Sequence, residues 1–215
     1  MRSEIINQIE KNKIIAIMRG VEVGDAVRVA EALYKGGVKF VEVTFNQSDT
    51  NSFIDTANMI KAIKTAMAGK MCVGAGTVIT KEQLQLAYEA GAEYIISPDT
   101  DENIILKTVE MGMVSIPGAY TATEVKKAHN AGADFVKLFP SSISYLKAIK
   151  APLSHIKFLA VGGIDLSNAK EFIKAGATGI GVGGFLVNQS WIKAGNFDKI
   201  TETATALVNN IEKFK

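Results

Sequence analysis

The sequence predicts an α/β protein folded as a single (β/α)8 TIM barrel over residues 1–215, with an extra helix at the N-terminus. Eight short apolar runs recur along the chain, a helix-like stretch follows each run, and the length approaches the roughly 250 residues usual for such barrels. Strict alternation of strand and helix implies right-handed βαβ units and a parallel sheet. An open doubly wound sheet is the alternative arrangement of these units.

The predicted strands are rich in β-branched and aromatic residues, and each ends in turn chemistry. They are Ile14 to Met18, Phe40 to Thr44, Cys72 to Ala75, Tyr94 to Ser97, Met113 to Ile116, Phe135 to Phe139, Phe158 to Val161 and Gly179 to Val182. Residues 1–12 are expected to form an amphipathic helix that closes the barrel floor, and residues 197–215 the last outer helix.

The sequence also predicts where several helices begin and end. Thr80 with Gln83, and Thr121 with Glu124, have the spacing of a capping box at a helix start. Glycine recurs just ahead of the strands, where the preceding helix should end, at Gly37, Gly91, Gly112, Gly132 and Gly176. One small βα unit is therefore repeated along the chain.

Composition excludes several functional classes. The chain has 24 basic and 22 acidic residues without a basic cluster, so nucleic acid is not an expected partner. It shows neither a signal peptide nor an apolar run long enough to span a membrane, and Cys72 is its one cysteine, so a cytoplasmic location is expected. His129 and His155 lack metal-ligand spacing and are interpreted as surface or packing residues, so no metal is expected. Cys72 lies in an apolar run and is interpreted as a buried structural thiol.

Three charged residues stand in or directly after apolar strands, where barrel enzymes place catalytic groups. Arg19 ends the first strand, Glu42 lies in the second and Lys137 in the sixth. Because strand side chains alternate with a period of two, all three converge if those faces point inward. An ion pair of Glu42 with Lys137 that merely fills the barrel is the alternative.

A lysine buried in such a strand should have a lowered pKa, because burial disfavours its charged form. The neutral amine is the nucleophile that forms a Schiff base with a carbonyl substrate. Glu42 is placed to transfer protons during imine formation and bond cleavage. The protonated imine accepts the electrons released by cleavage, so no cofactor is expected.

Glycine-rich turns follow the last two strands, at Gly162-Gly163 and Gly183-Gly184. The loops at these positions commonly bind phosphate in TIM barrels, through bare backbone amides. Tight turns without a ligand would explain the same glycines. The run Gly74-Ala75-Gly76-Thr77 lacks the third glycine of a dinucleotide fingerprint, so a nicotinamide cofactor is not expected.

With these residues in place, the sequence resembles the 2-keto-3-deoxy-6-phosphogluconate (KDPG) aldolase family, which includes members acting on 4-hydroxy-2-oxoglutarate (KHG). The resemblance runs nearly end to end, and its ordered motifs are specific as a set. They are Ile17-Met18-Arg19, Val41-Glu42-Val43-Thr44, Val73-Gly74-Ala75-Gly76-Thr77-Val78, Ile96-Ser97-Pro98, Ile116-Pro117-Gly118, Val136-Lys137-Leu138-Phe139-Pro140 and Gly162-Gly163-Ile164.

The resemblance implies a class I aldolase in which Lys137 forms the imine and Glu42 is the general acid and base. The products would be pyruvate and glyceraldehyde 3-phosphate, without a cofactor, and the assembly a homotrimer. The residues implied in binding the phosphorylated 2-keto acid are Arg19, Thr44, Thr77, Pro98, Pro117, Phe139, Gly162, Gly163, Gly183 and Gly184.

Three departures from the family pattern affect binding rather than the imine. Many members have an arginine where this chain has Phe45-Asn46-Gln47, so the substrate carboxylate depends more on Arg19. Ala160-Val161 replaces Pro-Thr, which removes a hydroxyl near the substrate, and Gly183-Gly184 replaces a loop end that commonly holds serine. The phosphate end therefore offers backbone donors.

Other functions remain open from the sequence. Within the same chemistry, the substrate could be KHG or the 2-keto-3-deoxy-6-phosphogalactonate epimer. A noncatalytic barrel that binds a sugar phosphate is an alternative of another class, because a barrel does not guarantee catalysis. A third is a phosphate-binding isomerase in which Lys137 is an acid or an electrostatic group.

Overall fold

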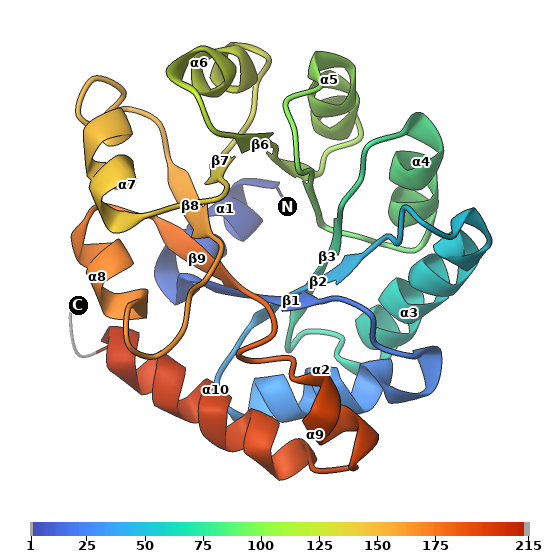
Figure 1. The fold of residues 1–215 in the computed structure, drawn as a ribbon. Helices are drawn as coiled ribbons and strands as arrows, with labels where there is room; N and C mark the ends of the chain where they lie inside the picture. Colours follow the sequence, from blue (N-terminus) through green and yellow to red (C-terminus); the bar gives the residue numbers. More distant parts are fainter. Residues whose placement is uncertain (1, 213–215) are drawn as a thin grey trace.

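The computed structural model describes residues 2–212 and places nine parallel strands in a barrel surrounded by helices (Figure 1). The strands are β1 (Ile14–Met18), β2 (Phe40–Thr44), β3 (Cys72–Gly76), β4 (Tyr94–Ile96), β5 (Val114–Ile116), β6 (Gly118–Ala119), β7 (Val136–Leu138), β8 (Phe158–Val161) and β9 (Gly179–Val182). The helices are α1 (Arg2–Asn12), α2 (Ala26–Lys35), α3 (Phe53–Ala66), α4 (Lys81–Glu89), α5 (Glu102–Glu110), α6 (Ala122–Asn130), α7 (Ile143–Lys150), α8 (Ala169–Lys174), α9 (Gln189–Lys193) and α10 (Phe197–Glu212).

The ninth strand, β6, was not predicted: it lies just after Pro117, whereas the predicted fifth strand ended at Ile116 and corresponds to β5. Proline has no N–H to donate to the ladder, so regular pairing is interrupted there. The two edge strands of the sheet are β5 and β6, with β1 and β9 near the middle of the strand order. Pro117 connects these edge strands directly, so it closes the barrel. The backbone N–H of Lys137 donates to the Pro117 carbonyl at 2.8 Å and that of Phe139 to the Ala119 carbonyl. The barrel prediction is confirmed, and the open doubly wound sheet was wrong.

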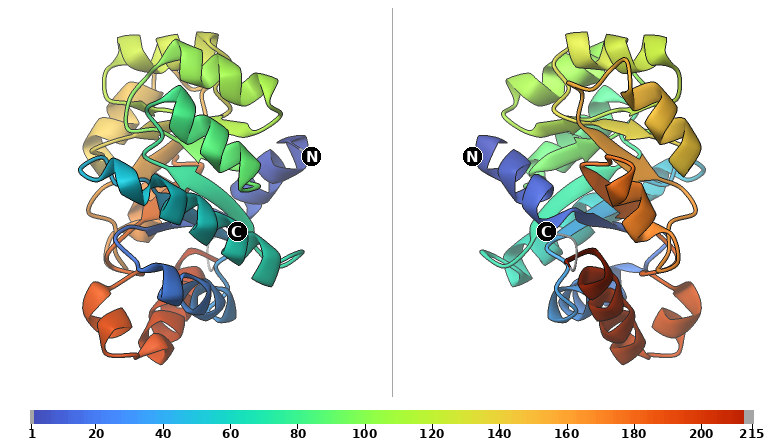
Figure 2. Two further views of the ribbon diagram at one scale, coloured as in Figure 1. Left: turned by 90° about the vertical axis from the view of Figure 1, so that its right-hand side faces the viewer. Right: turned by 90° about the vertical axis from the view of Figure 1, so that its left-hand side faces the viewer.

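Two apolar layers form the core. Inward side chains, including Ile15, Phe40 and Tyr94, pack together inside the barrel with Ile5 and Ile9 from α1. The other face of each strand packs against the surrounding helices in a larger apolar cluster. Helix α1 therefore closes one end of the barrel, as expected, and Figure 2 shows it projecting from that end.

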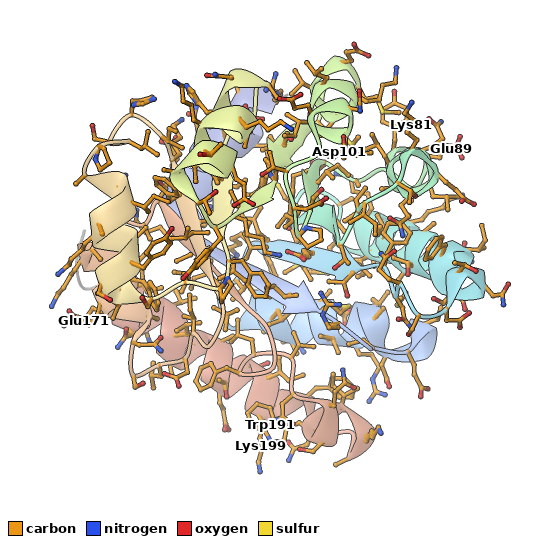
Figure 3. All side chains as sticks on the ribbon, turned by 45° about the horizontal axis from the view of Figure 1, so that its top comes forward. Lys81, Glu89, Asp101, Glu171, Trp191 and Lys199 are labelled. Carbon is orange, nitrogen blue, oxygen red and sulfur yellow. The ribbon has the colours of Figure 1, made fainter. Side chains whose placement is uncertain are left out.

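The outer faces of the helices are polar, and Lys81, Glu89 and Lys199 project away from the barrel (Figure 3). Both predicted capping boxes form, with each threonine side chain accepting from the backbone N–H three residues later. Glycines that were predicted to mark helix ends, such as Gly91 and Gly132, adopt positive φ just after a helix. No helix within residues 2–212 is long and apolar enough to cross a bilayer.

Two helix predictions need adjustment. Helix α10 is described from Phe197 to Glu212, and the predicted extension over residues 213–215 lies outside the described residues, as does Met1. Helix α9 was missed. Its available signal was Asn188, whose side chain accepts hydrogen bonds from the backbone N–H groups of Ser190 and Trp191.

Candidate active site

A cavity of about 730 Å³ opens where the strands end at their carboxyl termini. Residues on six strands, or directly after them, contribute to its wall, as the (β/α)8 architecture predicts. Every predicted site residue except Thr44 and Pro117 lines it. Those that do are Arg19, Glu42, Thr77, Pro98, Lys137, Phe139, Gly162, Gly163, Gly183 and Gly184.

Lys137 lies in the middle of β7 with its side chain inside the barrel, 7% exposed. Burial lowers the pKa of its amine; the charge of Glu42 opposes this shift and that of Arg19 adds to it. The ammonium nitrogen is 5.0 Å from the centre of the Phe139 ring, which covers one side of it. The amine is therefore biased toward the neutral form that attacks carbonyl carbons.

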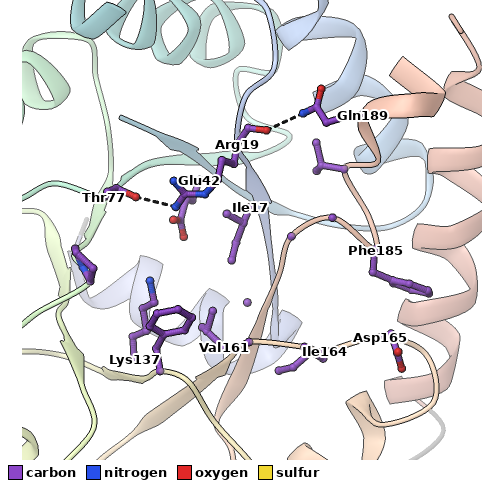
Figure 4. A pocket seen from close by; sticks show the side chains of 18 residues that line it. Ile17, Arg19, Glu42, Thr77, Lys137, Val161, Ile164, Asp165, Phe185 and Gln189 are labelled. Carbon is purple, nitrogen blue, oxygen red and sulfur yellow. Dashed lines mark hydrogen bonds between the residues drawn. The ribbon is translucent and has the colours of Figure 1, made fainter. Parts of the chain in front are cut away.

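Glu42 lies in the middle of β2 and points toward Lys137 across the cavity (Figure 4). Its pKa is raised by burial, against the opposing charges of Lys137 and Arg19. Within the described residues, Glu42 and Lys137 form no salt bridge, although each shifts the pKa of the other. The interpretation of the two groups as a space-filling ion pair therefore fails, because they face a cavity with room between them.

Glu42 occupies its position because β3 has glycine beside it. A Cβ added to Gly76 would lie 2.0 Å from Glu42 Oε1 and 2.5 Å from its Cδ, far inside contact distance. A Cβ on Gly74 would likewise collide with the ring of Tyr94. The two glycines thus leave space within the barrel for an acid and an aromatic ring. The signal that could have revealed this was glycine inside a strand, which often marks a close approach.

Arg19 and Thr77 form a polar pair at the mouth of the cavity (Figure 4). Arg19 Nη2 donates to Thr77 Oγ1 at 2.9 Å, and Gln189 Nε2 donates to the Arg19 carbonyl at 2.7 Å. Thr77 has φ of +57°, a rare conformation for a β-branched residue. Such strain is typical of functional positions, and a guanidinium beside a hydroxyl is suited to binding a carboxylate.

The opposite end of the cavity is formed by the two glycine turns after β8 and β9. A Cβ at Gly163 or Gly184 would meet nothing within 4 Å, so both turns border open space. Asn168 Nδ2 donates to the Gly163 carbonyl at 2.8 Å and braces the first turn. Open space bounded by bare backbone suits a small anionic or hydroxyl-bearing group.

Thr44 and Pro117 do not line this cavity. The Thr44 hydroxyl is within 3.3 Å of the Met18 carbonyl and donates to it, which ties β2 to β1. Pro117 contributes its carbonyl to the backbone N–H of Lys137. Both therefore support the strands that carry the charged residues.

Lining residues that sequence reasoning missed include Ile17, Asp165, Phe185 and Gln189. Ile17 shares the inward face with Arg19, so the period of two could have identified it. No sequence signal pointed to Asp165 and Phe185, which follow strands in irregular loops, and Gln189 begins the missed helix α9.

Cys72, His129 and His155 lie outside the cavity. Burial raises the pKa of the Cys72 thiol to about 11, so the reactive thiolate is disfavoured. The exposed rings of His129 and His155 pack edge to face with centres 5.1 Å apart. Among residues 2–212, no group of three or more His, Cys, Asp and Glu residues is arranged to hold a metal ion.

Comparison with known proteins agrees with this geometry. The family model described as "KDPG and KHG aldolase" matches residues 5–203. The chain belongs to the KDPG and KHG aldolase family. The resemblance seen in the sequence motifs is therefore confirmed over nearly the whole chain.

Within the KDPG and KHG aldolase family, several proteins are similar to this chain. The 2-dehydro-3-deoxy-phosphogluconate aldolase of Treponema pallidum (strain Nichols) is 32% identical, covering 92% of each chain. The 2-dehydro-3-deoxy-6-phosphogalactonate aldolase of Escherichia coli (strain K12) is 37% identical, covering 80% of this chain and 83% of the relative. A solved KDPG aldolase from Legionella pneumophila, described with pyruvate captured as a covalent carbinolamine intermediate, has a TM-score of 0.82 and 29% identity, covering 91% of this chain and 94% of that one.

Proposed function

We propose that this protein is a class I aldolase that cleaves KDPG to pyruvate and glyceraldehyde 3-phosphate, and KHG to pyruvate and glyoxylate. The observation that carries the proposal is the buried amine of Lys137, with its lowered pKa, facing the buried carboxyl group of Glu42 across a cavity. Family membership and the aldolase names of the relatives support it.

In the proposed reaction, the neutral amine of Lys137 attacks the keto carbon, and loss of water from the carbinolamine leaves a protonated imine. Glu42 supplies and removes the protons of these steps, then takes the proton of the hydroxyl next to the breaking bond. As that carbon–carbon bond breaks, its electrons move into the imine to give an enamine, and the aldehyde leaves. Protonation of the enamine and hydrolysis release pyruvate and restore the amine.

The remaining lining residues bind the substrate. Arg19 and Thr77 hold the carboxylate next to the keto carbon, where their hydrogen-bonded pair already stands at the cavity mouth. Pro98 and Phe139 contribute apolar walls. The phosphate, when present, lies against the backbone of Gly162, Gly163, Gly183 and Gly184.

Reductive trapping tests the proposed chemistry directly. Borohydride added to the protein with pyruvate should attach a pyruvyl group to Lys137, identified by peptide mass spectrometry. An unmodified Lys137 would remove the imine mechanism. A noncatalytic binding barrel would instead be stabilised by sugar phosphates without releasing pyruvate, which a lactate dehydrogenase-coupled assay measures.

A second candidate substrate is the galactonate epimer of KDPG. Val161 lines the cavity where many family members have a hydroxyl, so this part of the wall is apolar. The similarity to the phosphogalactonate aldolase of Escherichia coli also favours this candidate. Comparing kcat/KM for KDPG, its epimer and KHG ranks the three, and the candidate is wrong if the epimer is the poorest.

Gly76→Ala is expected to lower kcat roughly 100-fold, because the new methyl group must displace the carboxyl group of Glu42. Pyruvate release with the best substrate measures the loss. Gly24→Ala is the matched control, since a Cβ there meets nothing within 4 Å, and it should leave kcat unchanged. Equal kcat values for the two variants would show that the position of Glu42 is unimportant.

We also propose that the protein acts as a homotrimer in the cytoplasm. The family resemblance supports a trimer, and a structural neighbour with a TM-score of 0.83 and 33% identity is described as a protein cage designed by fusing symmetric oligomeric domains. Light scattering should give about three times the chain mass of 23.0 kDa. A mass equal to one chain would contradict the trimer.

A further inference from the structure

The carboxylate-binding pair depends on an unfavourable backbone conformation. Thr77 places its hydroxyl against Arg19 while its φ is +57°. Holding a β-branched residue in this region costs an amount comparable to one hydrogen bond, so some other contact must compensate for it. A hydrogen bond to the peptide of Thr77 is a contact of this kind.

The compensating contact comes from Gln47, in the loop after β2. Gln47 Nε2 donates to the Thr77 carbonyl at 2.8 Å. Gln47 does not line the cavity, so it reaches the substrate site through Thr77. Its bond is made to the backbone of the strained residue itself, where it acts on the peptide orientation.

Gln47 is itself held by a fully buried residue, Gln83 of α4. Gln83 Nε2 donates to Gln47 Oε1 at 2.9 Å. The Oε1 atom of Gln83 accepts from the backbone N–H of Thr80, which completes the capping box, and also from that of Ile79. Each end of the Gln83 amide therefore has a partner, which sets its orientation and in turn that of Gln47.

We propose that Gln47, anchored by Gln83, is a positioning residue. It holds the Thr77 hydroxyl against Arg19 so that the two groups can bind the substrate carboxylate. This inference rests on the proposed function and adds to it a determinant of affinity for 2-keto acids. Removing the Gln47 amide weakens binding of the carboxylate and leaves the imine chemistry at Lys137 and Glu42 intact.

The test compares Gln47→Leu with Gln85→Leu, which removes an exposed glutamine whose amide donates only to Glu89 on the same helix. Trapping rates are measured against concentration for pyruvate and for its uncharged methyl ester. Gln47→Leu should raise the half-saturating pyruvate concentration and the KM of the cleaved substrate roughly five- to tenfold. Its kcat and its trapping by the ester should change less than about twofold, and Gln85→Leu should change none of these values.

A second variant isolates the hydrogen bond from loop folding. Gln83→Glu keeps an acceptor for the helix start but loses the donor to Gln47, so it should raise the half-saturating pyruvate concentration in the same way. The positioning role is overturned if Gln47→Leu raises the half-saturating concentrations of pyruvate and of the ester equally. It is also overturned if neither Gln47→Leu nor Gln83→Glu changes the half-saturating pyruvate concentration. If the unsubstituted protein is not trapped at Lys137, the proposed function fails. In that case, the increase in Tm on adding pyruvate tests the inference separately. The inference requires a smaller increase in Gln47→Leu than in Gln85→Leu.

Discussion

Lys137→Arg is expected to lose at least about 10⁴-fold in kcat and all reductive trapping by pyruvate. Arginine places a fixed positive charge at this position of β7, and its guanidinium stays protonated and forms no imine. The variant therefore separates covalent catalysis from a merely electrostatic role. Pyruvate release and mass spectrometry of the trapped protein are the two measurements.

Lys150→Arg is a matched control for this variant. Lys150 is also partly buried with a pKa lowered by burial, but it lies on α7 outside the cavity. It should retain both kcat and trapping. Substantial remaining activity in Lys137→Arg would favour an isomerase-like barrel, in which the residue at position 137 supplies charge alone.

Glu42→Gln is expected to lower kcat by roughly 10²- to 10⁴-fold, because the amide cannot exchange protons with the substrate. It should also move the acid limb of the trapping rate to lower pH. The charge of Glu42 raises the pKa of Lys137 and thereby opposes the effect of burial. Without that charge the pKa falls further below 10.5, so the neutral amine persists at lower pH.

The control for the pH profile is Glu124→Gln. Glu124 belongs to the capping box of α6, where glutamine serves equally well, and it lies outside the cavity. This variant should keep both kcat and the acid limb. An acid limb that stays in place or rises in Glu42→Gln would mean that the two groups are not coupled.

Much of the site was predictable because a strand has a period of two. Once β1, β2 and β7 are parallel strands of one closed barrel, their inward side chains Arg19, Glu42 and Lys137 converge on the cavity at the carboxyl ends. The same period placed Thr44 on the face of Glu42. It did not reveal that the Thr44 hydroxyl bonds to β1 and stays out of the cavity.

The sequence by itself determined the repeated βα unit, the inward charged residues and the family, since these depend on local periodicity and ordered motifs. The tertiary structure decided which atoms meet. Gly76 leaves room for Glu42 from the neighbouring strand, Pro117 joins the two ends of the sheet, and Gln47 reaches the Thr77 carbonyl from another loop. Such contacts join residues far apart in the chain, and they follow from close packing and hydrogen-bond geometry, which no local pattern encodes.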